Sequence, residues 1–434
     1  MRPRSRQPGF IVSAPSSRSG KTVLTLGLIR ALVERGRTVS PRKIGPDYID
    51  PTFLAAAARR PALNLDAWAM GMGRVQARLG EGTIVAEAAM GLFDGAADGT
   101  GSAADIASGL GMPVLLVLNA AHTSHSLGAV LRGFASHRRG VRVGAVIANM
   151  LGSDRHGRMV EAALRPVCEE FGIELLGMVP RDARLALPSR HLGLVPASER
   201  EGIEAFVDDA ASLVSQHVDL EGVEELGFSA PEVRHIAPCF PILGRRVAVA
   251  RDEAFAFAYP HALDDWHASG VEVVPFSPLA DEGPDADADA VFLPGGYPEL
   301  HAPRLAASER FRTGMERAAG RGAFVYGECG GYMVLGDRLT DADGASHAML
   351  GMLPLATSFA ERRLQLGYRK LAARSRSPLG MSHAGHEHHH ATIVSEGDAD
   401  ALFDVRDAEG NDLGVAGLRR ANVCGSFMHI IASR

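Results

Sequence analysis

The chain has 434 residues, of which 46% are hydrophobic and 22% are charged, and it carries a formal net charge of −6 at pH 7. Because a single hydrophobic core stops growing at roughly 250–300 residues, this length predicts at least two domains. The acidic balance argues against a nucleic-acid-binding protein, and no apolar run reaches the ~18 residues that a membrane span needs. We therefore expect a cytoplasmic protein without nucleic-acid or membrane partners.

The four cysteines do not suggest a shared function. Cys168, Cys239, Cys329 and Cys424 lie far apart in the sequence, and they include no Cys-x-x-Cys pair. Neither a disulfide framework nor a zinc cluster is indicated. Any functional cysteine is expected to act alone.

Six short apolar runs in the first half alternate with amphipathic stretches, several of which predict helices. This alternation is typical of a doubly wound parallel sheet, in which ligands bind outside the carboxyl ends of the strands. The residues that follow each run are therefore informative about function. The predicted strands cover residues 10–13, 38–43, 83–87, 113–119, 141–149 and 175–180.

The first predicted strand leads into a loop at residues 14–20 and then into a helical pattern at 22–35. This order directs several backbone N–H groups and the positive end of the helix dipole at one point, which suits a polyphosphate. Lys21 and Thr22 match the end of the Walker A motif, in which lysine contacts the β- and γ-phosphates and the hydroxyl contacts Mg²⁺. We expect ATP to bind at Ser16, Ser17, Ser19, Gly20, Lys21 and Thr22.

Carboxylates follow the second and third predicted strands. Asp47 and Asp50 lie in a turn that a Gly-Pro and an Asp-Pro pair make rigid. Glu87 ends the third strand directly, and Asp94 follows seven residues later. Thr22, Asp47 and Glu87 together would give Mg²⁺ the hard oxygen ligands that it prefers beside phosphates.

The phosphate loop and the strand-end acids also have simpler explanations. Only one of the two Walker A glycines is present, so an ordinary strand-to-helix turn is an alternative. The acids have an alternative as solvated loop residues, above all Asp50 and Asp94. Asn149, which ends another predicted strand, is a candidate for contacting the nucleotide base, but asparagine at a strand end is as often a turn former.

Periodicity weakens between residues 218 and 244, where three prolines stand among charged and small residues. Such a stretch is typical of a domain junction. We predict a first domain at residues 1–218, a linker at 219–244 and a second domain at 245–434. A new series of strands is then predicted at residues 246–251, 271–275, 290–294 and 323–328.

Cys329 stands between the last of these strands and a predicted helix. A cysteine at such a turn has its thiol at a helix N-terminus, where the thiolate is stabilised and nucleophilic, and the flanking glycines allow a tight turn. The Gly295-Gly296 pair ends the preceding strand, so Gly296 and Gly330 are candidate amide donors to an oxyanion. A buried, inert cysteine is the alternative.

The histidines give a weaker signal because the chain has 17 of them. His429, 100 residues after Cys329, is the candidate base near the carboxyl end. The run at residues 386–390 has metal-ligand residue types, but neighbours along a strand point to opposite faces and cannot all converge. We expect His386, Glu387 and His389 to make structural or interdomain polar contacts, and residues 374–383 to form a loop.

The combined motifs carry a family resemblance over residues 9–429. Residues 14–22, 45–51, 90–95 and 190–194 resemble those of cobyrinic and hydrogenobyrinic acid a,c-diamide synthases, whose first domain is similar to dethiobiotin synthetase. The cysteine turn and the terminal Gly-Ser-Phe-x-His resemble a class I glutamine amidotransferase of the cobalamin pathway. The implied fold is α/β: a P-loop, doubly wound parallel sheet domain followed by a class I glutamine amidotransferase-like α/β domain.

The resemblance implies a ligase that uses ATP and Mg²⁺ to activate the a and c acetates of hydrogenobyrinic or cobyrinic acid as acyl phosphates, with L-glutamine as the ammonia source. Cys329 and His429 would be catalytic. The corrinoid would contact Asp47, Tyr48, Asp50, Met90 and Asp94, and a homodimer is possible. Ile431 stands where class I enzymes usually carry an acid, which fits a Cys–His dyad or a third member from elsewhere.

Three other functions remain at this stage. Cobyric acid synthase shares both domain types but amidates other side chains. Nickel-sirohydrochlorin a,c-diamide synthase amidates an equivalent pair, but that family has Phe where this chain has Tyr48. A partitioning or regulatory ATPase would use the phosphate loop as a switch and would leave Cys329 and His429 without a role.

Overall fold

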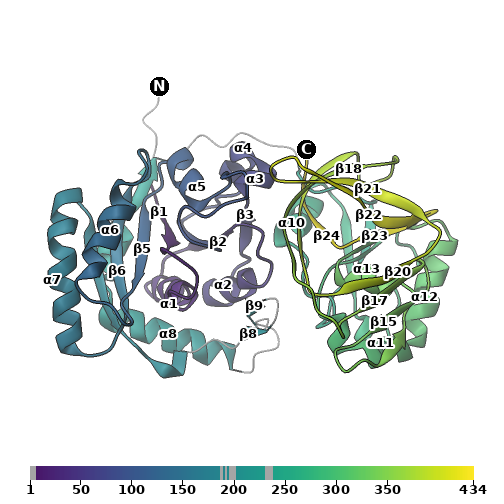
Figure 1. Cartoon of the computed structure of the whole chain (residues 1–434), viewed down its shortest axis with the longest axis horizontal. Helices are drawn as coiled ribbons and strands as arrows, with labels where there is room; N and C mark the ends of the chain where they lie inside the picture. The colour runs from purple at the N-terminus through teal and green to yellow at the C-terminus, as the bar shows by residue number, and fades with distance from the viewer. Residues whose placement is uncertain (1–5, 186–188, 191–192, 195–201, 230–237) are drawn as a thin grey trace. The chain divides into compact units, whose positions relative to one another are not determined.

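The computed structural model describes residues 6–185, 189–190, 193–194, 202–229 and 238–434 (Figure 1). The chain divides into two compact units, residues 1–190 with 194–236, and residues 191–193 with 237–434. Each unit is described by itself. Among the described residues, no helix is both long enough and apolar enough to cross a membrane.

The first unit contains a parallel sheet with the strand order β3-β2-β4-β1-β5-β6-β7. All residues of β2 and β4 are buried, because helices cover both faces of the sheet. Side chains on such strands must therefore be apolar or paired. The predicted doubly wound sheet is confirmed. The strands are β1 Arg6–Ser13, β2 Val39–Ile44, β3 Leu63–Leu65, β4 Thr83–Ala88, β5 Val114–Asn119, β6 Val143–Leu151 and β7 Glu174–Pro180.

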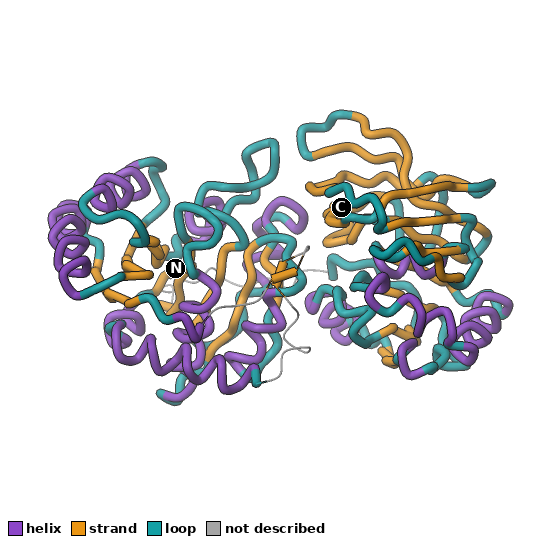
Figure 2. Tube along the Cα trace, turned by 60° about the horizontal axis from the view of Figure 1, so that its bottom comes forward, coloured by secondary structure: helices purple, strands orange, loops and turns teal. Residues whose placement is uncertain are grey.

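The helices of the first unit lie on both sides of this sheet (Figures 1 and 2). Helices α1, α2 and α8 pack together, and α6 packs against α7. The described helices are α1 Lys21–Glu34, α2 Asp50–Ala58, α3 Ala67–Met70, α4 Met72–Ala77, α5 Ala103–Leu110, α6 Ser126–Ser136, α7 Asp154–Phe171, α8 Ile203–His217 and α9 Leu220–Glu225, with a 3₁₀ turn at Ala183–Leu185.

A buried arginine fixes the helix that follows the phosphate loop. The Arg30 side chain of α1 is fully buried and pairs with Glu204 at 2.8 Å and Asp208 at 2.5 Å, both on α8. Its remaining donors reach the carbonyl oxygens of Ala56 and Ala57 in α2. Because a buried charge without partners is costly, these contacts hold α1 in one position against α2 and α8.

Part of the predicted linker is ordered within the first unit. Residues 220–225 form α9, and β10 (Gly227–Ser229) pairs antiparallel with the first residues of β1. Residues 230–237 lie outside the described part of the chain. Of the motif at 190–194, His191 and Leu192 lie outside it as well, and the short strands β8 (Ser189–Arg190) and β9 (Gly193–Leu194) flank them.

The second unit contains a ten-stranded sheet with the order β12-β11-β13-β14-β23-β22-β21-β18-β19-β24. The strands from β12 to β23 run parallel, and the remainder is antiparallel. The bounds are β11 Arg246–Ala250, β12 Glu272–Phe276, β13 Ala290–Leu293, β14 Phe324–Glu328, β18 Gln365–Ala373, β19 Ser382–His389, β21 Asp400–Asp407, β22 Asp412–Arg420, β23 Val423–Ser426 and β24 Met428–Ser433. The predicted loop at 374–383 is too long at its end, since β19 begins at Ser382.

A smaller sheet and short helices complete this unit. The smaller sheet has the order β16-β15-β17-β20. The elements are β15 Arg338–Thr340, β16 Ser346–Ala348, β17 Leu355–Ser358, β20 Thr392–Glu396, α10 Pro260–Ala268, α11 Ala302–Ala307, α12 Glu309–Gly320, α13 Gly330–Leu335, η3 Pro278–Ala280 and η4 Pro298–Leu300. Register between β19 and β24 places His386 opposite His429.

A pair of glycine substitutions tests the packing of α1 against α8. A Cβ atom at Gly27 would lie 2.5 Å from the carbonyl oxygen of Ala210 in α8, so Gly27→Ala is expected to lower the free energy of unfolding by about 1–3 kcal/mol. Gly133→Ala in α6 is the control because its Cβ would meet open space, and it is expected to be neutral or to stabilise by up to about 1 kcal/mol. Urea unfolding of both variants checks this; equal stabilities would contradict the described helix contact.

Candidate functional site

The loop between β1 and α1 is held by the strand-end residue Asn149. Gly20 has a φ of 80°, and a Cβ atom there would lie 2.3 Å from Asn149 Nδ2. The same Nδ2 donates to the Ser19 carbonyl at 3.1 Å. Glycine is therefore required at position 20 for both space and backbone conformation. The predicted contact of Asn149 with a nucleotide base stays a prediction.

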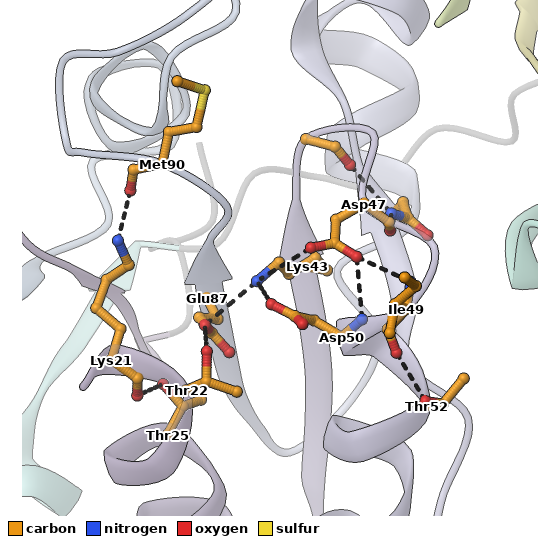
Figure 3. Close-up of polar contacts among 12 residues, drawn as sticks. Lys21, Thr22, Thr25, Lys43, Asp47, Ile49, Asp50, Thr52, Glu87 and Met90 are labelled. Atoms are coloured by element: carbon orange, nitrogen blue, oxygen red, sulfur yellow. Dashed lines mark hydrogen bonds and ion pairs between the residues drawn. The ribbon is translucent and has the colours of Figure 1, made fainter. Parts of the chain in front are cut away.

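Within this loop, polar groups bond to the backbone. Ser19 Oγ donates to the Ser16 carbonyl at 2.8 Å, and Ser16 Oγ donates to the Ser17 carbonyl at 3.3 Å. Lys21 Nζ donates to the Met90 carbonyl at 2.8 Å (Figure 3). It donates more weakly to the Ser16 carbonyl at 3.4 Å. Burial lowers the pKa of Lys21. These neutral carbonyls are acceptors that phosphate oxygens can replace.

Beside the loop, Thr22 and Glu87 meet as the sequence predicts. Thr22 Oγ1 donates to Glu87 Oε1 at 2.7 Å, and the Glu87 side chain is 1% exposed. Glu87 Oε2 is buried and accepts no hydrogen bond from the described residues. A buried carboxylate oxygen without a donor is costly, so it marks a position for a cation or a donor from a ligand.

Lys43, at the end of β2, joins the acids of this edge and was missed in the sequence analysis. Its Nζ atom lies 2.5 Å from Asp50 Oδ2, 3.2 Å from Glu87 Oε1 and 4.0 Å from Asp47 Oδ2 (Figure 3). Burial by itself lowers the pKa of Lys43, but Asp50, Glu87 and Asp47 together raise it above its usual value. The available signal was its position near the end of a predicted strand, two residues before the Gly-Pro turn, because ligands bind outside the carboxyl ends of parallel strands.

The residues around Lys43 fit a magnesium ion that also binds phosphates. Three carboxylates and one lysine leave a charge of about −2 when all are ionised, which a divalent cation balances. Among the described residues, no group of three or more His, Cys, Asp or Glu side chains is arranged to hold a metal ion alone. The fit is therefore to an ion held by Thr22 and one or two carboxylates, here Glu87 and Asp47, with phosphate and water oxygens completing the shell.

The predicted substrate residues do not form one group. Asp47 Oδ1 accepts hydrogen bonds from the amides of Ile49 and Asp50, so Asp47 also fixes the start of α2. Tyr48 is buried, whereas the Met90 side chain is 52% exposed. Asp94 is exposed and accepts from the Gly91 amide within its own turn. Their roles in substrate binding stay predictions.

In the second unit, Cys329 forms the sharp turn that the sequence predicts. It lies between β14 and α13 with a φ of 47°, a strained conformation for a residue other than glycine. Its amide donates to the Ser426 carbonyl at 2.8 Å, and the Gly331 amide donates to the Pro294 carbonyl at 3.1 Å. A Cβ atom at Gly331 would lie only 2.0 Å from the Leu293 carbonyl, so the turn requires glycine there.

Cys329 and His429 lie together around Gly295. A Cβ atom at Gly295 would lie 2.5 Å from His429 Cε1, 3.2 Å from its Nε2 and 3.3 Å from Cys329 Cβ. The two candidate catalytic residues are therefore neighbours although they stand 100 residues apart in the sequence. Gly296 and Gly330 also meet, since a Cβ atom at Gly330 would lie 2.9 Å from the Gly296 amide nitrogen. Their predicted role as oxyanion donors stays open.

Burial controls the ionisation of this pair. Burial and then Glu299 raise the pKa of the Cys329 thiol, against a hydrogen bond from the Gly330 amide that lowers it. Burial, with His388 and His389, lowers the pKa of His429 to about 3. The amide at the helix N-terminus thus favours the thiolate as expected, but enclosure of the sulfur acts in the opposite direction and is the larger effect on its pKa.

The histidine run forms strand β19 and makes contacts within the second unit. Glu387 pairs with Arg369 at 2.7 Å, and its Oε1 accepts a hydrogen bond from His389 Nε2 at 3.0 Å. His389 stacks on Phe427, and the His386 ring packs against Tyr368. The structural reading of His386, Glu387 and His389 thus agrees with these contacts, and the Cys329 thiol lies 4.0 Å from the His388 carbonyl oxygen.

Family models match both units of the chain. Residues 10–195 match the CobQ/CobB/MinD/ParA nucleotide-binding domain, and residues 246–434 match the CobB/CobQ-like glutamine amidotransferase domain. The fold and the two sites therefore define a protein that joins a nucleotide-binding domain to a glutamine amidotransferase domain.

Relatives along the whole chain narrow this class. Proteins named hydrogenobyrinate a,c-diamide synthase from Brucella suis biovar 1 (strain 1330) and Rhizobium meliloti (strain 1021) are 52% and 53% identical to it; the alignments cover 98% of this chain and 98% and 99% of theirs. This chain belongs to the hydrogenobyrinate a,c-diamide synthase family, which confirms the resemblance. Among solved structures, PurLQS from Thermotoga maritima covers 42% of this chain and 86% of its own with 21% identity and a TM-score of 0.31, too low to add to the assignment.

The ionisation of Asp47 predicts how Mg²⁺·ATP binding depends on pH. Burial and then Asp50 raise the pKa of Asp47 to about 7. Binding a cation requires the carboxylate, so affinity is expected to fall by about tenfold per pH unit below 7. In the free protein the sign is opposite: folded Asp47 holds its proton to higher pH than unfolded Asp47, so its contribution to stability declines as pH rises from about 4 to 7.

Calorimetric titration between pH 5.5 and 8.5 measures this dependence. Asp47→Asn is expected to weaken binding and to flatten its pH dependence. Asp94→Asn is the matched control because this acid is exposed and accepts a hydrogen bond from the Gly91 amide three residues earlier. In this variant the wild-type dependence of binding on pH is expected to persist. An unchanged slope in Asp47→Asn would remove Asp47 as the group responsible.

Gly295 predicts a selective defect in the second unit. Gly295→Ala would push the new methyl group into the His429 ring, so glutamine hydrolysis is expected to fall about 100-fold or more. Gly320→Ala at the end of α12 faces open space and is expected to leave the rate unchanged. Glutamate release by each variant is the measurement, and wild-type hydrolysis in Gly295→Ala would contradict a role for His429 at this position.

Proposed function

We propose that this protein amidates the a and c acetate carboxylates of hydrogenobyrinic acid, with ATP and L-glutamine as co-substrates. The observation that carries the proposal is the presence of two chemically complementary sites on one chain: a phosphate loop beside the Thr22 hydroxyl and the Glu87 carboxylate, and a Cys329–His429 pair. The names of relatives that align over nearly the whole chain support the choice of substrate.

The first unit activates the carboxylate. An acetate oxygen of the substrate attacks the γ-phosphorus of ATP, the bond to the bridging oxygen breaks, and ADP leaves. Lys21 would contact the β- and γ-phosphates, and Thr22, Glu87 and Asp47 would hold Mg²⁺, which neutralises the phosphate charge. Lys43 keeps Asp47, Asp50 and Glu87 together at this edge. Activation is needed because hydroxide is a poor leaving group.

The second unit supplies ammonia. Cys329 Sγ attacks the side-chain carbonyl of glutamine while His429 takes the thiol proton, and the C–N bond breaks as His429 returns a proton to the leaving ammonia. Water hydrolyses the thioester to glutamate. Ammonia then attacks the acyl phosphate and expels phosphate, which completes one amide.

Product analysis tests the proposal. Purified protein is incubated with hydrogenobyrinic acid or cobyrinic acid, Mg²⁺·ATP and glutamine. The products are then separated by chromatography and identified by mass spectrometry. The expected product is the a,c-diamide, with two ATP and two glutamine consumed per ring, and faster turnover of the cobalt-free ring. Hydrolysis of ATP and glutamine without conversion of either ring would overturn the proposal.

Two substitutions are expected to separate the half-reactions. Cys329→Ala should abolish glutamine-dependent amidation but preserve synthesis from high ammonium salt at raised pH, since the thiol is needed only to release ammonia. Lys21→Ala should abolish synthesis from either nitrogen source, since activation precedes both. Ammonium-dependent synthesis in Lys21→Ala at the wild-type rate would exclude the ATP role of the loop, and its loss in folded Cys329→Ala would tie the cysteine to activation.

A further inference from the structure

The His429 base lacks an acid at the position where one is expected. Class I glutamine amidotransferases usually carry an acid two residues after the histidine, and here that residue is Ile431, which is fully buried. A histidine that must take and return a proton works best when a third group fixes its orientation and tautomer. The structure therefore raises the question of which group faces the second ring nitrogen.

Glu328, the residue directly before Cys329, faces that nitrogen. Glu328 Oε2 lies 3.8 Å from His429 Nδ1, and the two side chains are 2% and 0% exposed. The distance exceeds a hydrogen bond, but catalytic hydrogen bonds are often long before substrate binds. His429 Nε2, in contrast, lies on the side of Gly295 and Cys329. The imidazole ring thus has Glu328 facing Nδ1, and Nε2 lies on the side of Cys329.

Fixed contacts hold the Glu328 carboxyl in this position. Glu328 Oε1 accepts a hydrogen bond from the Ile430 amide at 2.9 Å and another from Tyr326 Oη at 3.1 Å. The first contact anchors the carboxyl to the residue that follows the base. Because both donors use Oε1, Oε2 is the oxygen left toward His429.

We infer that Glu328 is the positioning residue of the glutaminase site and replaces the acid missing at position 431. An Nδ1–H of His429 directed at Oε2 leaves the Nε2 lone pair to accept the Cys329 proton. When His429 becomes an imidazolium, the carboxylate stabilises its charge. Burial raises the pKa of Glu328 to about 8, against hydrogen bonds from the Ile430 amide and Tyr326 Oη that lower it. This inference rests on the proposed roles of Cys329 and His429.

Glu328→Gln in the full-length protein is the central test, because the amide keeps the shape and an acceptor for Ile430 but removes the charge. Glutamine hydrolysis is expected to lose about 100-fold or more in kcat with less than about threefold change in KM. Ammonium-dependent amidation should stay at the wild-type rate. Tyr326→Phe is the graded comparison, since it removes one of the two hydrogen bonds to Oε1 but keeps the carboxylate and the Ile430 contact, so its kcat should fall by about tenfold or less, a smaller loss than in Glu328→Gln.

A second readout separates positioning from a structural role. Alkylation of Cys329 by iodoacetamide reports its thiolate, and its onset in Glu328→Gln is expected at higher pH than in wild type because the imidazolium partner is less stable. His388, His389, Glu299 and Glu387, the other titratable groups that act on the pair, are unchanged in this variant. An unshifted onset together with equal losses in Tyr326→Phe and Glu328→Gln would assign Glu328 to folding alone and overturn the inference.

Glu328→Asp and Cys329→Ala complete the design. The aspartate keeps the charge at a longer distance, so its kcat should lie between those of wild type and Glu328→Gln; a value at or below that of Glu328→Gln would count against the inference. Cys329→Ala distinguishes failure of the inference about Glu328 from failure of the proposed role of Cys329. If Cys329→Ala abolishes glutamine hydrolysis while Glu328→Gln retains full kcat, the role of Glu328 is excluded and the proposed function stands. Glutamine hydrolysis by Cys329→Ala would instead overturn the proposed function.

Discussion

The ion cluster around Lys43 is the interaction on which the first unit depends. Removing an ammonium group from water costs several kcal/mol, so a lysine that is 1% exposed persists only with close partners. Asp50 at 2.5 Å and Glu87 at 3.2 Å provide them, and the raised pKa of Lys43 indicates that their attraction outweighs burial. The same contacts bring the ends of β2, β4 and α2 together beside the phosphate loop.

Close backbone approach plays the corresponding part in the second unit. Gly295, Gly330 and Gly331 each stand where a methyl group would meet another atom at less than 3 Å. Interiors are packed closely enough that such positions admit little adjustment. The strained turn at Cys329 is therefore held by backbone contacts to Ser426 of β23 and to Pro294, which follows β13.

Most parallel strands could be predicted because strands buried on both faces tend to appear as apolar runs. The short strands β3 and β23 were not predicted, since three or four residues give too little pattern. The burial of the histidine run in β19 could not be predicted, since it depends on Arg369 and Phe427, which come from other segments. Lys43 follows the strand-end rule, but its burial depends on acids from other segments. The raised pKa of Cys329 was likewise beyond the sequence, because enclosure is a property of the folded unit.

Glu87 and Glu328 show that one arrangement serves both sites. Each acid stands at or next to the carboxyl end of an internal parallel strand, where the following turn leads into the reacting groups. In each, Oε1 is held by hydrogen bonds or an ion pair, from Thr22 and Lys43 in one case and from Ile430 and Tyr326 in the other. Oε2 of Glu87 is buried without a hydrogen-bond donor among the described residues, and Oε2 of Glu328 faces His429, so these are the oxygens to which the proposed roles assign the chemistry. A carboxylate fixed through one oxygen can direct the other without reorganising during the reaction, which is the condition for electrostatic stabilisation of a transition state.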